Sequence, residues 1–333
     1  MARKRKMKCG VVGYGPSCEM GRLHLQSMAA QKVFVPTAVC DLNEERLASA
    51  RSDFPGIETY TDMGKMLRKS GVELVAVILP HNLHAKAAIR CLNAGCNVVV
   101  EKPFALTVEE CDAMIAAAKK NRRMLSTFHN RHWDANIVTI MKHIKKIGRT
   151  FRWESYQGGW RRPGRSWRSD RKISGGIIFD WGAHFVEWML QVLPYKMTEI
   201  SGFGINEVWK HCTNEDELEA VVRFGGNAVG SHTVSHVAAA GKPMIRILGT
   251  KGAITATHSE VTVHTFGPDG ERIATSVPMV KPGWDPYYRS VRNHLVGKKK
   301  LVITPEYARR VIQVLDYATR SSKLGKSLKP KYK

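Results

Sequence analysis

Between residues 7 and about 130, short apolar segments alternate with segments of helical periodicity. The stretches "KCGVVG" and "FVPTAVCD" are typical of strands, and "ELVAVILP" and "NVVVEKP" are continuous apolar runs, as in strands covered on both faces. Between them, "NEERLASARSDF" has Asn43 as a helix cap, and Gly95 ends the helical "NLHAKAAIRCLNAG". Thr107 and Glu110 have the spacing of a capping box for the next helix. The pattern predicts an α/β fold with a doubly wound parallel sheet.

Beyond residue 130 the pattern changes to one helix, "IVTIMKHIKK", a strand near "TFRWESYQ", and then period-two alternation in "DELEAVVRF" and "NAVGSHTVSHV". Alternation of this kind favours an antiparallel sheet. A last helix begins at "TPEYARR", where Pro305 suits the first helical position. We expect a dinucleotide-binding Rossmann domain over 7–130 and a substrate and oligomerisation domain with a large open sheet over 131–303. The helix of 304–322 is expected to pack back on the N-terminal domain.

The composition predicts a globular protein of the cytoplasm. Hydrophobic residues make up 43% of the 333 residues, and no apolar run approaches the roughly 20 residues that span a bilayer. The basic start "MARKRKMK" is followed by "CGVVGYGPS", which has neither the apolar segment nor the cleavage site of a signal peptide. The seven cysteines are scattered, without C-x-x-C spacing, and are interpreted as reduced thiols within the core. No membrane partner is expected.

The chain is strongly basic, with 52 Lys and Arg against 29 Asp and Glu and a formal charge of +23. This charge favours anionic partners. Helix-turn-helix, zinc and aromatic RNA-binding signatures are missing from the sequence, so the charge predicts no specific binding of nucleic acid.

A glycine-containing loop, "GVVGYGPSCEMGRLH", follows the first expected strand and leads into a helix. A dinucleotide's pyrophosphate binds at such a place because glycines let the backbone approach closely and the helix N-terminus offers unpaired amides. The interval to the last glycine is three residues longer than in G-x-G-x-x-G, and a glycine turn without a ligand is the alternative. The residues expected to contact the cofactor are Gly13, Tyr14, Gly15, Pro16 and Gly21.

Asp41 ends the second expected strand, 20 residues after Gly21. A carboxylate at this place accepts hydrogen bonds from the adenosine ribose and repels a 2′-phosphate. The sequence therefore favours NAD, while the nearby Arg22 and Arg46 leave NADP as the alternative.

The segment "EKPFALT" places Glu101 and Lys102 at the carboxyl end of a buried strand. In doubly wound sheets ligands bind at these ends, so both residues are expected beside the nicotinamide. Pro80, His81 and His84, in the loop after the fourth strand, are expected to line the same end of the cofactor site. An exposed Glu-Lys pair without a role is the alternative.

The stretch "SGGIIFDWGAHFVEWMLQVL", residues 174–193, predicts an apolar helix with one polar stripe. Asp180, His184 and Glu187 stand at i, i+4 and i+7 and therefore share a face. Burying ionisable groups costs free energy unless they are paired or used, and a structural Asp-His pair is the alternative. His184 is the candidate general base, because an imidazole exchanges protons near neutral pH.

Taken together, a Rossmann half ending in "EKP", followed by "SGG" and a D-x-G-x-H signature, resembles the glucose-fructose oxidoreductase, inositol dehydrogenase and MocA (Gfo/Idh/MocA) family. The resemblance covers nearly the whole chain. Three departures are the longer phosphate loop, Glu187 in place of a frequent aspartate, and Ile177 in place of a third glycine.

The resemblance implies an NAD(P)-dependent oxidoreductase that transfers a hydride between nicotinamide and a secondary hydroxyl of a sugar, polyol or sugar acid. It implies a cis Lys102–Pro103 peptide, Lys102 bound to the reacting oxygen, and Asp180 orienting the imidazole or holding a neighbouring hydroxyl. Arg131 corresponds to a family arginine near the cleft. A homodimer or homotetramer, formed through the open sheet, is implied as well.

The loop "GGWRRPGRSWRSDRK" precedes the catalytic segment, and its substrate-binding candidates are Trp160, Arg161, Arg165 and Trp167. Tryptophans stack on sugar faces and arginines bind carboxylate or phosphate, so an anionic sugar fits; a solvated basic surface is the alternative. Histidine pairs such as His81 with His84 lack a carboxylate or thiolate at a matching interval, so no metal is expected. Two other functions stay open: an NAD-dependent redox glycosidase with the same residues, and a non-catalytic cofactor-binding regulator.

Overall fold

The computed structural model describes residues 6–15, 19–281 and 283–333. The chain divides into two compact units. Unit 1 consists of Met1–His129 and Asp285–Arg309, and unit 2 consists of Asn130–Trp284 and Arg310–Lys333.

Unit 1 contains a parallel sheet of six strands in the order β3-β2-β1-β4-β5-β6. This order reverses between β1 and β4, as in a doubly wound Rossmann fold, and confirms the expected fold class. The strands are β1 Met7–Val12, β2 Phe34–Cys40, β3 Glu58–Tyr60, β4 Leu74–Val77, β5 Asn97–Val100 and β6 Leu125–Thr127. The helices lying wholly in unit 1 are α1 Met20–Ala29, α2 Glu44–Asp53, α3 Met63–Lys69, α4 His84–Asn93, α5 Val108–Asn121 and α9 Asp285–Leu295, with a short 3-10 turn η2 His81–Leu83 before α4.

Both predicted helix caps are present in unit 1. The side chain of Asn43 accepts hydrogen bonds from the backbone N–H groups of Glu45 and Arg46, which begins α2. Thr107 accepts from the N–H of Glu110 at 3.1 Å and begins α5. The carboxylate of Glu110 returns to the N–H of Leu106, one residue before the cap, and not to Thr107 itself. These bonds satisfy amides that have no partner inside the helix.

Unit 2 contains an eight-stranded sheet in the order β14-β13-β12-β11-β7-β10-β9-β8. Its neighbouring strands run antiparallel except for β7 and β10, which confirms the expected mostly antiparallel sheet. The strands are β7 Thr150–Gly158, β8 Met197–Ile205, β9 Glu217–Phe224, β10 Ala228–Ser235, β11 Ile245–Gly249, β12 Gly252–Ala256, β13 Val261–Phe266 and β14 Arg272–Ser276. Its helices are α6 Ala135–His143, α7 Arg171–Ser174, α8 Gly182–Val192 and most of α10 Pro305–Leu324; its 3-10 turns are η3 Asn130–Trp133, η4 Ile144–Ile147, η5 Trp167–Ser169 and η6 Ile177–Phe179.

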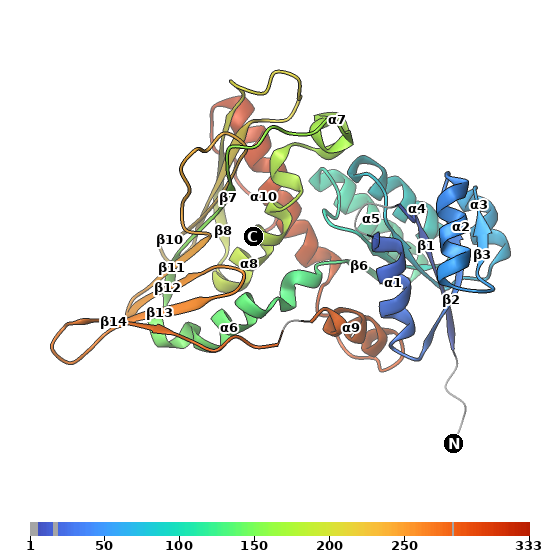
Figure 1. Cartoon of the computed structure of the whole chain (residues 1–333), viewed down its shortest axis with the longest axis horizontal. Coiled ribbons are helices and arrows are strands. Elements are labelled where there is room, and N and C mark those ends of the chain that lie inside the picture. The colour runs from blue at the N-terminus through green and yellow to red at the C-terminus, as the bar shows by residue number, and fades with distance from the viewer. Residues whose placement is uncertain (1–5, 16–18, 282) are drawn as a thin grey trace. The chain divides into compact units, whose positions relative to one another are not determined.

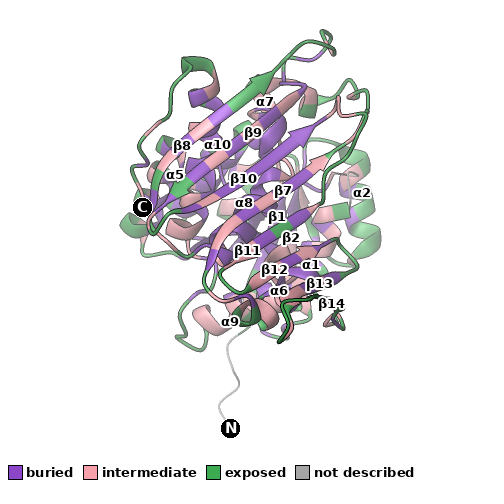
Figure 2. Cartoon of the chain, turned by 90° about the vertical axis from the view of Figure 1, so that its left-hand side faces the viewer, coloured by how far each residue is buried: buried purple, intermediate pink, exposed green. Residues whose placement is uncertain are grey.

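Helices α8 and α10 pack on the same side of β7 to β10 (Figure 1). Phe185 of α8 stacks on His232 of β10 with ring centroids 4.7 Å apart and the planes at 14°. Gly202 of β8 lets α10 approach, because a Cβ there would lie 1.9 Å from the carbonyl oxygen of Ala318. Figure 2 shows buried residues along β9 and β10, whereas β14 is exposed. The Phe185–His232 contact thus joins α8 to the sheet, and the approach at Gly202 joins α10 to it.

The prediction of a helix over residues 174–193 is wrong for the first part of that range. Gly175 and Gly176 have φ angles of 92° and 128°, outside the helical region, and a 3-10 turn follows at Ile177–Phe179. The N–H of Ile177 is bound by Glu215 at 3.3 Å instead of by a helix carbonyl. The α-helix therefore begins at Gly182, and Asp180 precedes it.

The C-terminal part of the chain differs from the expected ranges. Helix α9 was not predicted, and residues 285–309 belong to unit 1, although the expected second domain extended to residue 303. Helix α10 contributes its first residues, through Arg309, to unit 1 and the rest to unit 2. Among the described residues, no helix has the length and apolar character to span a bilayer.

Candidate active site

The glycine loop after β1 folds tightly against β4. Gly13 has φ +95°, and a Cβ there would lie 1.8 Å from the carbonyl oxygen of Ile78, so the position requires glycine. A Cβ on Gly21 would lie 2.5 Å from the ring of Tyr14. Beside Gly15, by contrast, a Cβ would meet only the guanidinium of Arg46 at 3.6 Å. Pro16, one of the expected cofactor contacts, lies outside the described residues.

Asp41, directly after β2, is buried and well ordered by hydrogen bonds. Its Oδ2 accepts from the N–H of Tyr14 at 2.7 Å, and its Oδ1 accepts from the N–H of Asn43 at 2.9 Å. The Arg46 guanidinium lies 3.4 Å from Oδ1. The glycine loop and the end of β2 are thus joined, with one carboxylate and one cation side by side. Tyr14 also binds Asp53 through its hydroxyl, and burial together with that carboxylate raises the pKa of Tyr14.

Glu101, Lys102 and Pro103 follow β5 directly, and the Lys102–Pro103 peptide is cis. Glu101 is buried, with Oε1 3.0 Å from Nε2 of His24 and Oε2 accepting from the N–H of Lys102 at 2.9 Å. Burial acts to raise the pKa of Glu101, but the hydrogen bond from His24 and the charge of Lys102 lower it on balance. The carboxylate is therefore ionised at neutral pH.

The two histidines expected near the nicotinamide are both buried. His81 is 4% exposed, and His84 is fully buried. Nδ1 of His84 lies 2.7 Å from the carbonyl oxygen of Pro103, and Nε2 lies 2.8 Å from that of Leu79. The ring of His84 thus contacts the backbone on both sides. Pro80, before η2, is half-buried.

His24 was missed by sequence reasoning. It lies on α1 among the buried positions Gly21, Leu25 and Met28, a spacing that places it on the apolar face of that helix. A histidine on such a face needs polar partners, and that is the signal the sequence carried. Its partners, Glu101 and Tyr288, are 77 and 264 residues away in the chain.

In unit 2, His184 and Glu187 both lie on α8, and Asp180 stands two residues before the helix. His184 is 4% exposed and its ring lies against Trp181, with centroids 5.7 Å apart. Glu187 binds His132 of η3 at 2.6 Å and Gln191 of its own helix at 3.1 Å. Asp180 is half-buried. Glu187 therefore belongs to a buried, hydrogen-bonded cluster with His132 and Gln191.

A pocket of about 670 Å³ lies wholly within unit 2. Arg131 lies in it with its guanidinium 4.6 Å from the ring of Trp181 and 5.6 Å from that of Trp284. Asp134 binds Arg131 at 2.7 Å and accepts from the indole N–H of Trp284 at 2.9 Å. The remaining lining residues are Ala135, Asn136, His258, Ser259, Met279, Val280 and Gly283. Trp181 therefore lines this pocket and also lies against the ring of His184.

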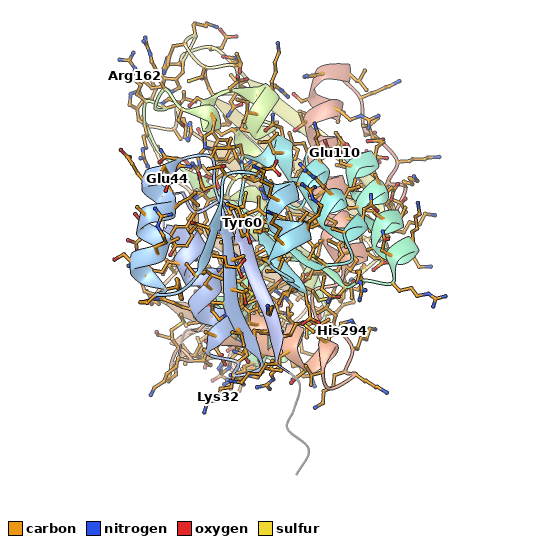
Figure 3. The ribbon with its side chains drawn as sticks, turned by 90° about the vertical axis from the view of Figure 1, so that its right-hand side faces the viewer. Lys32, Glu44, Tyr60, Glu110, Arg162 and His294 are labelled. Carbon is orange, nitrogen blue, oxygen red and sulfur yellow. The ribbon has the colours of Figure 1, made fainter. Side chains whose placement is uncertain are left out.

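The basic loop between β7 and α7 is largely exposed. Trp160 is 60% exposed, Arg161 and Arg165 are exposed, and Arg162 projects from the outer side of the loop (Figure 3). Trp167 is half-buried, with the Arg168 guanidinium 4.3 Å from its ring. Trp160, Arg161, Arg165 and Trp167 do not line the pocket that contains Arg131. Among the described residues, no cluster of three His, Cys, Asp or Glu has the arrangement of a metal site.

A doubly wound parallel sheet with a glycine loop after β1 and a carboxylate after β2 is typical of a dinucleotide-binding protein. The model of the oxidoreductase family with an NAD-binding Rossmann fold matches residues 7–129, and that of the GFO/IDH/MocA C-terminal domain matches residues 141–255. The chain belongs to the Gfo/Idh/MocA family of NAD-binding oxidoreductases, which confirms the resemblance noted in the sequence.

Several curated proteins are similar to this chain. An uncharacterized oxidoreductase of Schizosaccharomyces pombe is 32% identical over 157 residues, which are 45% of this chain and 43% of that protein. The scyllo-inositol 2-dehydrogenase (NADP(+)) IolW of Bacillus subtilis is 24% identical over 95% of this chain and 94% of its own length. The myo-inositol 2-dehydrogenase of Thermotoga maritima is 26% identical over 80% of each protein.

Solved structures share the fold over the whole chain. An NAD-binding protein from Listeria innocua has a TM-score of 0.85 and 22% identity, and covers 98% of this chain and 97% of its own. The WlbA dehydrogenase from Bordetella pertussis, in complex with NADH and UDP-GlcNAcA, has a TM-score of 0.81 and 21% identity, and covers 99% of this chain and 100% of its own. At these identities the likeness concerns the fold alone.

Proposed function

We propose that this chain is an NAD(P)-dependent dehydrogenase that transfers a hydride between nicotinamide and a secondary hydroxyl of a sugar, polyol or sugar acid. The observation that carries the proposal is the position of Lys102. It follows β5 directly, at the carboxyl end of a parallel sheet, which is where doubly wound enzymes bind their ligands. The chain's membership in an oxidoreductase family supports the same reaction class.

The reaction removes a hydride from a carbinol carbon and a proton from its hydroxyl, leaving a C=O bond. Bound NAD(P) supplies the hydride acceptor. In this proposal His184 takes the hydroxyl proton as general base, and Lys102 donates a hydrogen bond to the same oxygen and stabilises negative charge that grows on it. Asp180, four residues before His184, orients the imidazole or binds a neighbouring hydroxyl of the substrate.

The residues of unit 1 fit a dinucleotide. Gly13 holds the loop against β4 where no Cβ fits, and Gly15 leaves room for a pyrophosphate. In this proposal Asp41, directly after β2, also accepts hydrogen bonds from the adenosine ribose, so NAD is the proposed cofactor. The nearby Arg46 is the feature that would favour NADP. Tyr14 and Gly21 shape the loop, while His81 and Pro80 border the nicotinamide end of this proposed site.

The substrate class is proposed from the relatives and from the pocket in unit 2. Two relatives are named as inositol dehydrogenases, which act on a polyol ring. Arg131 lines a pocket with two indole rings, and such rings pack against the apolar faces of sugars while guanidinium groups bind hydroxyl or carboxylate oxygens. Trp160, Arg161, Arg165 and Trp167 are proposed as outer contacts for an anionic substituent.

A screen of sugars, polyols and uronates with NAD and NADP, followed by absorbance of the reduced nicotinamide, tests the proposal. A substrate that yields NADH, with kcat reduced by about 10²- to 10⁴-fold in His184→Ala and Lys102→Met, is the expected result. Lys65→Met and His264→Ala are matched controls that leave kcat unchanged. Turnover that survives in both His184→Ala and Lys102→Met would contradict the assignment. If the chain instead cleaves an aryl glycoside without net production of NADH, the proposed dehydrogenase function is wrong and the function is that of an NAD-dependent glycosidase.

The same proposal includes assembly and location. We infer a homodimer or homotetramer formed through the eight-stranded sheet, which sedimentation of the purified chain tests. The six described cysteines, Cys9, Cys40, Cys91, Cys96, Cys111 and Cys212, are buried and form no disulfide, which supports a reducing compartment such as the cytoplasm. Burial raises the pKa of Cys9 to about 12 and that of Cys40 to about 11, which keeps both as thiols.

A further inference from the structure

Two buried histidines contact the residues on either side of Lys102. His24 of α1 binds the side chain of Glu101, and His84 of α4 binds the backbone carbonyl of Pro103. Both histidines, Glu101 and Pro103 belong to unit 1, and both imidazoles are fully buried. Neither histidine takes part in the hydride transfer proposed above.

The contact of His24 with Glu101 is one half of a three-residue chain. Nε2 of His24 lies 3.0 Å from Oε1 of Glu101, and Nδ1 lies 2.5 Å from the hydroxyl of Tyr288 on α9. With Nε2 protonated, the ring donates to the carboxylate and accepts from the tyrosine. Phe128 packs on the ring with centroids 4.2 Å apart. The imidazole is therefore held at both nitrogens and across one face. Its hydrogen bond in turn fixes the position of the Glu101 carboxylate.

The second oxygen of that carboxylate binds the backbone N–H of Lys102. Oε2 of Glu101 accepts from the Lys102 N–H at 2.9 Å. A carboxylate buried without partners costs several kcal/mol, so the bond from His24, together with the charge and the N–H of Lys102, keeps Glu101 ionised at this place. An ionised carboxylate is also a stronger acceptor for the Lys102 amide than its protonated form.

His84 holds the other side of the turn. As the first residue of α4, it lies between the carbonyl of Leu79, after β4, and that of Pro103, after β5. Burial lowers the pKa of His84, against the hydrogen bonds to the carbonyls of Pro103 and Leu79, which act to raise it. Carbonyl oxygens only accept, so each ring nitrogen that carries a proton donates to the carbonyl beside it. His84 thereby links the ends of two neighbouring strands at the residue that follows Lys102.

We propose that His24 and His84 are positioning residues that hold Glu101 and Pro103, and thereby fix the direction in which the Lys102 ammonium projects. The inference rests on the proposed function, in which Lys102 binds the reacting oxygen. Placement matters for this task because a misplacement of about 1 Å can cost about 10²-fold in rate. Tyr288 supports the same arrangement through His24.

A double-mutant cycle tests whether the histidines act through Lys102. His24→Leu and His84→Leu are each made in the wild-type and the Lys102→Met backgrounds, and kcat is measured with the substrate found by the screen. We expect each to lower kcat by about 10- to 100-fold alone and to have no further effect with Lys102→Met. His24→Gln, which keeps a donor for Glu101, recovers part of the loss. His294→Leu, on α9 (Figure 3), is the control and leaves kcat unchanged. Equal losses in both backgrounds would show a general structural role and overturn the inference.

Amide hydrogen exchange gives a readout that needs no substrate. Removing His24 releases the Glu101 carboxylate, so the Lys102 amide exchanges at least about tenfold faster in His24→Leu. The Ile78 amide, bound to the carbonyl of Val12 at 2.7 Å, is the reference and keeps its rate. An unchanged Lys102 amide overturns the inference, as does a general loss of protection in both His24→Leu and His24→Gln. Faster exchange at Lys102 with no sugar oxidised would uphold the positioning and reject the dehydrogenase. If the enzyme oxidises a sugar but the histidine and Lys102→Met substitutions have additive effects on kcat, the dehydrogenase is upheld and the positioning role of the histidines is rejected.

Discussion

Nδ1 of His132 lies 2.6 Å from Oε1 of Glu187, and this pair joins η3 to the middle of α8. The Glu187 side chain is 1% exposed, and Gln191 donates to both of its oxygens. The indole N–H of Trp188 donates to the carbonyl of Arg131 at 2.8 Å. Because η3 carries Arg131 and α8 carries His184, these bonds fix the pocket arginine relative to the candidate base within unit 2.

Glu187→Leu is expected to destabilise the chain. It removes the acceptor of His132 and Gln191, and a buried polar group left without its partner costs about 1–3 kcal/mol. The free energy of unfolding, measured by urea denaturation, should fall by that amount. Glu207→Leu is the matched control, because the Glu207 side chain is 80% exposed and a surface change should stay within about 0.5 kcal/mol. Equal effects of the two substitutions would contradict a structural role for the Glu187 pair.

Local patterns in the sequence were sufficient for the parallel sheet and its helix caps. Continuous apolar runs such as "NVVVEKP" require cover on both faces, and Asn43 caps α2 through amides two and three residues away. The contacts around Glu101 could not be predicted in this way, since Tyr288 reaches His24 from 264 residues away. The late start of α8 was missed because a bond from Glu215, 38 residues on, holds Ile177 out of a helix.

Asp41 is expected to decide between the two dinucleotides. In Asp41→Ser the ribose loses its acceptor and Arg46 loses the carboxylate 3.4 Å away, so the guanidinium becomes available for a 2′-phosphate. The dissociation constant of NADH should rise by about tenfold or more, and that of NADPH should fall, as measured by nicotinamide fluorescence. Glu44→Ser, which removes an exposed carboxylate of α2 that binds Arg51, is the control. If the ratio of the NADH and NADPH dissociation constants is the same in Asp41→Ser as in the wild type, Asp41 does not face the ribose.

Two arginines of unit 2 are expected to behave differently. Arg165 is exposed on the basic loop, so Arg165→Ala should raise KM more than it lowers kcat if the loop binds an anionic part of the substrate. Arg131 is held by Asp134 and two indoles, so Arg131→Lys should lower both kcat/KM and the free energy of unfolding, because lysine cannot replace the planar contacts. Steady-state kinetics and urea denaturation measure these effects. An unchanged KM in Arg165→Ala would leave the loop as a solvated basic surface.

His232 is expected to make the chain sensitive to acid. It lies fully buried on β10, stacked on Phe185, with Nδ1 3.0 Å from the hydroxyl of Ser155. Among the described residues, Nε2 has no hydrogen-bond partner. Burial lowers the pKa of His232 from 6.5 to about 3, so the folded chain keeps the ring neutral while the unfolded chain takes up a proton below about 6.5. The stability that depends on the neutral ring is complete above this value and is lost as the pH falls toward 3, by up to about 1.4 kcal/mol per pH unit.

The comparison that isolates this effect is between the wild type and His232→Gln, with urea denaturation at a series of pH values from 7 down to about 4. The wild type should lose stability faster on acidification, and the difference between the two chains should shrink or change sign as the pH falls. His264→Gln, on β13 of the same sheet, should follow the wild-type profile, since His264 is half-buried and its Nε2 bonds the hydroxyl of Thr255 at 2.9 Å. Parallel profiles for the wild type and His232→Gln would mean that the buried ring is not the group that resists protonation, and that the acid sensitivity lies in the carboxylates instead.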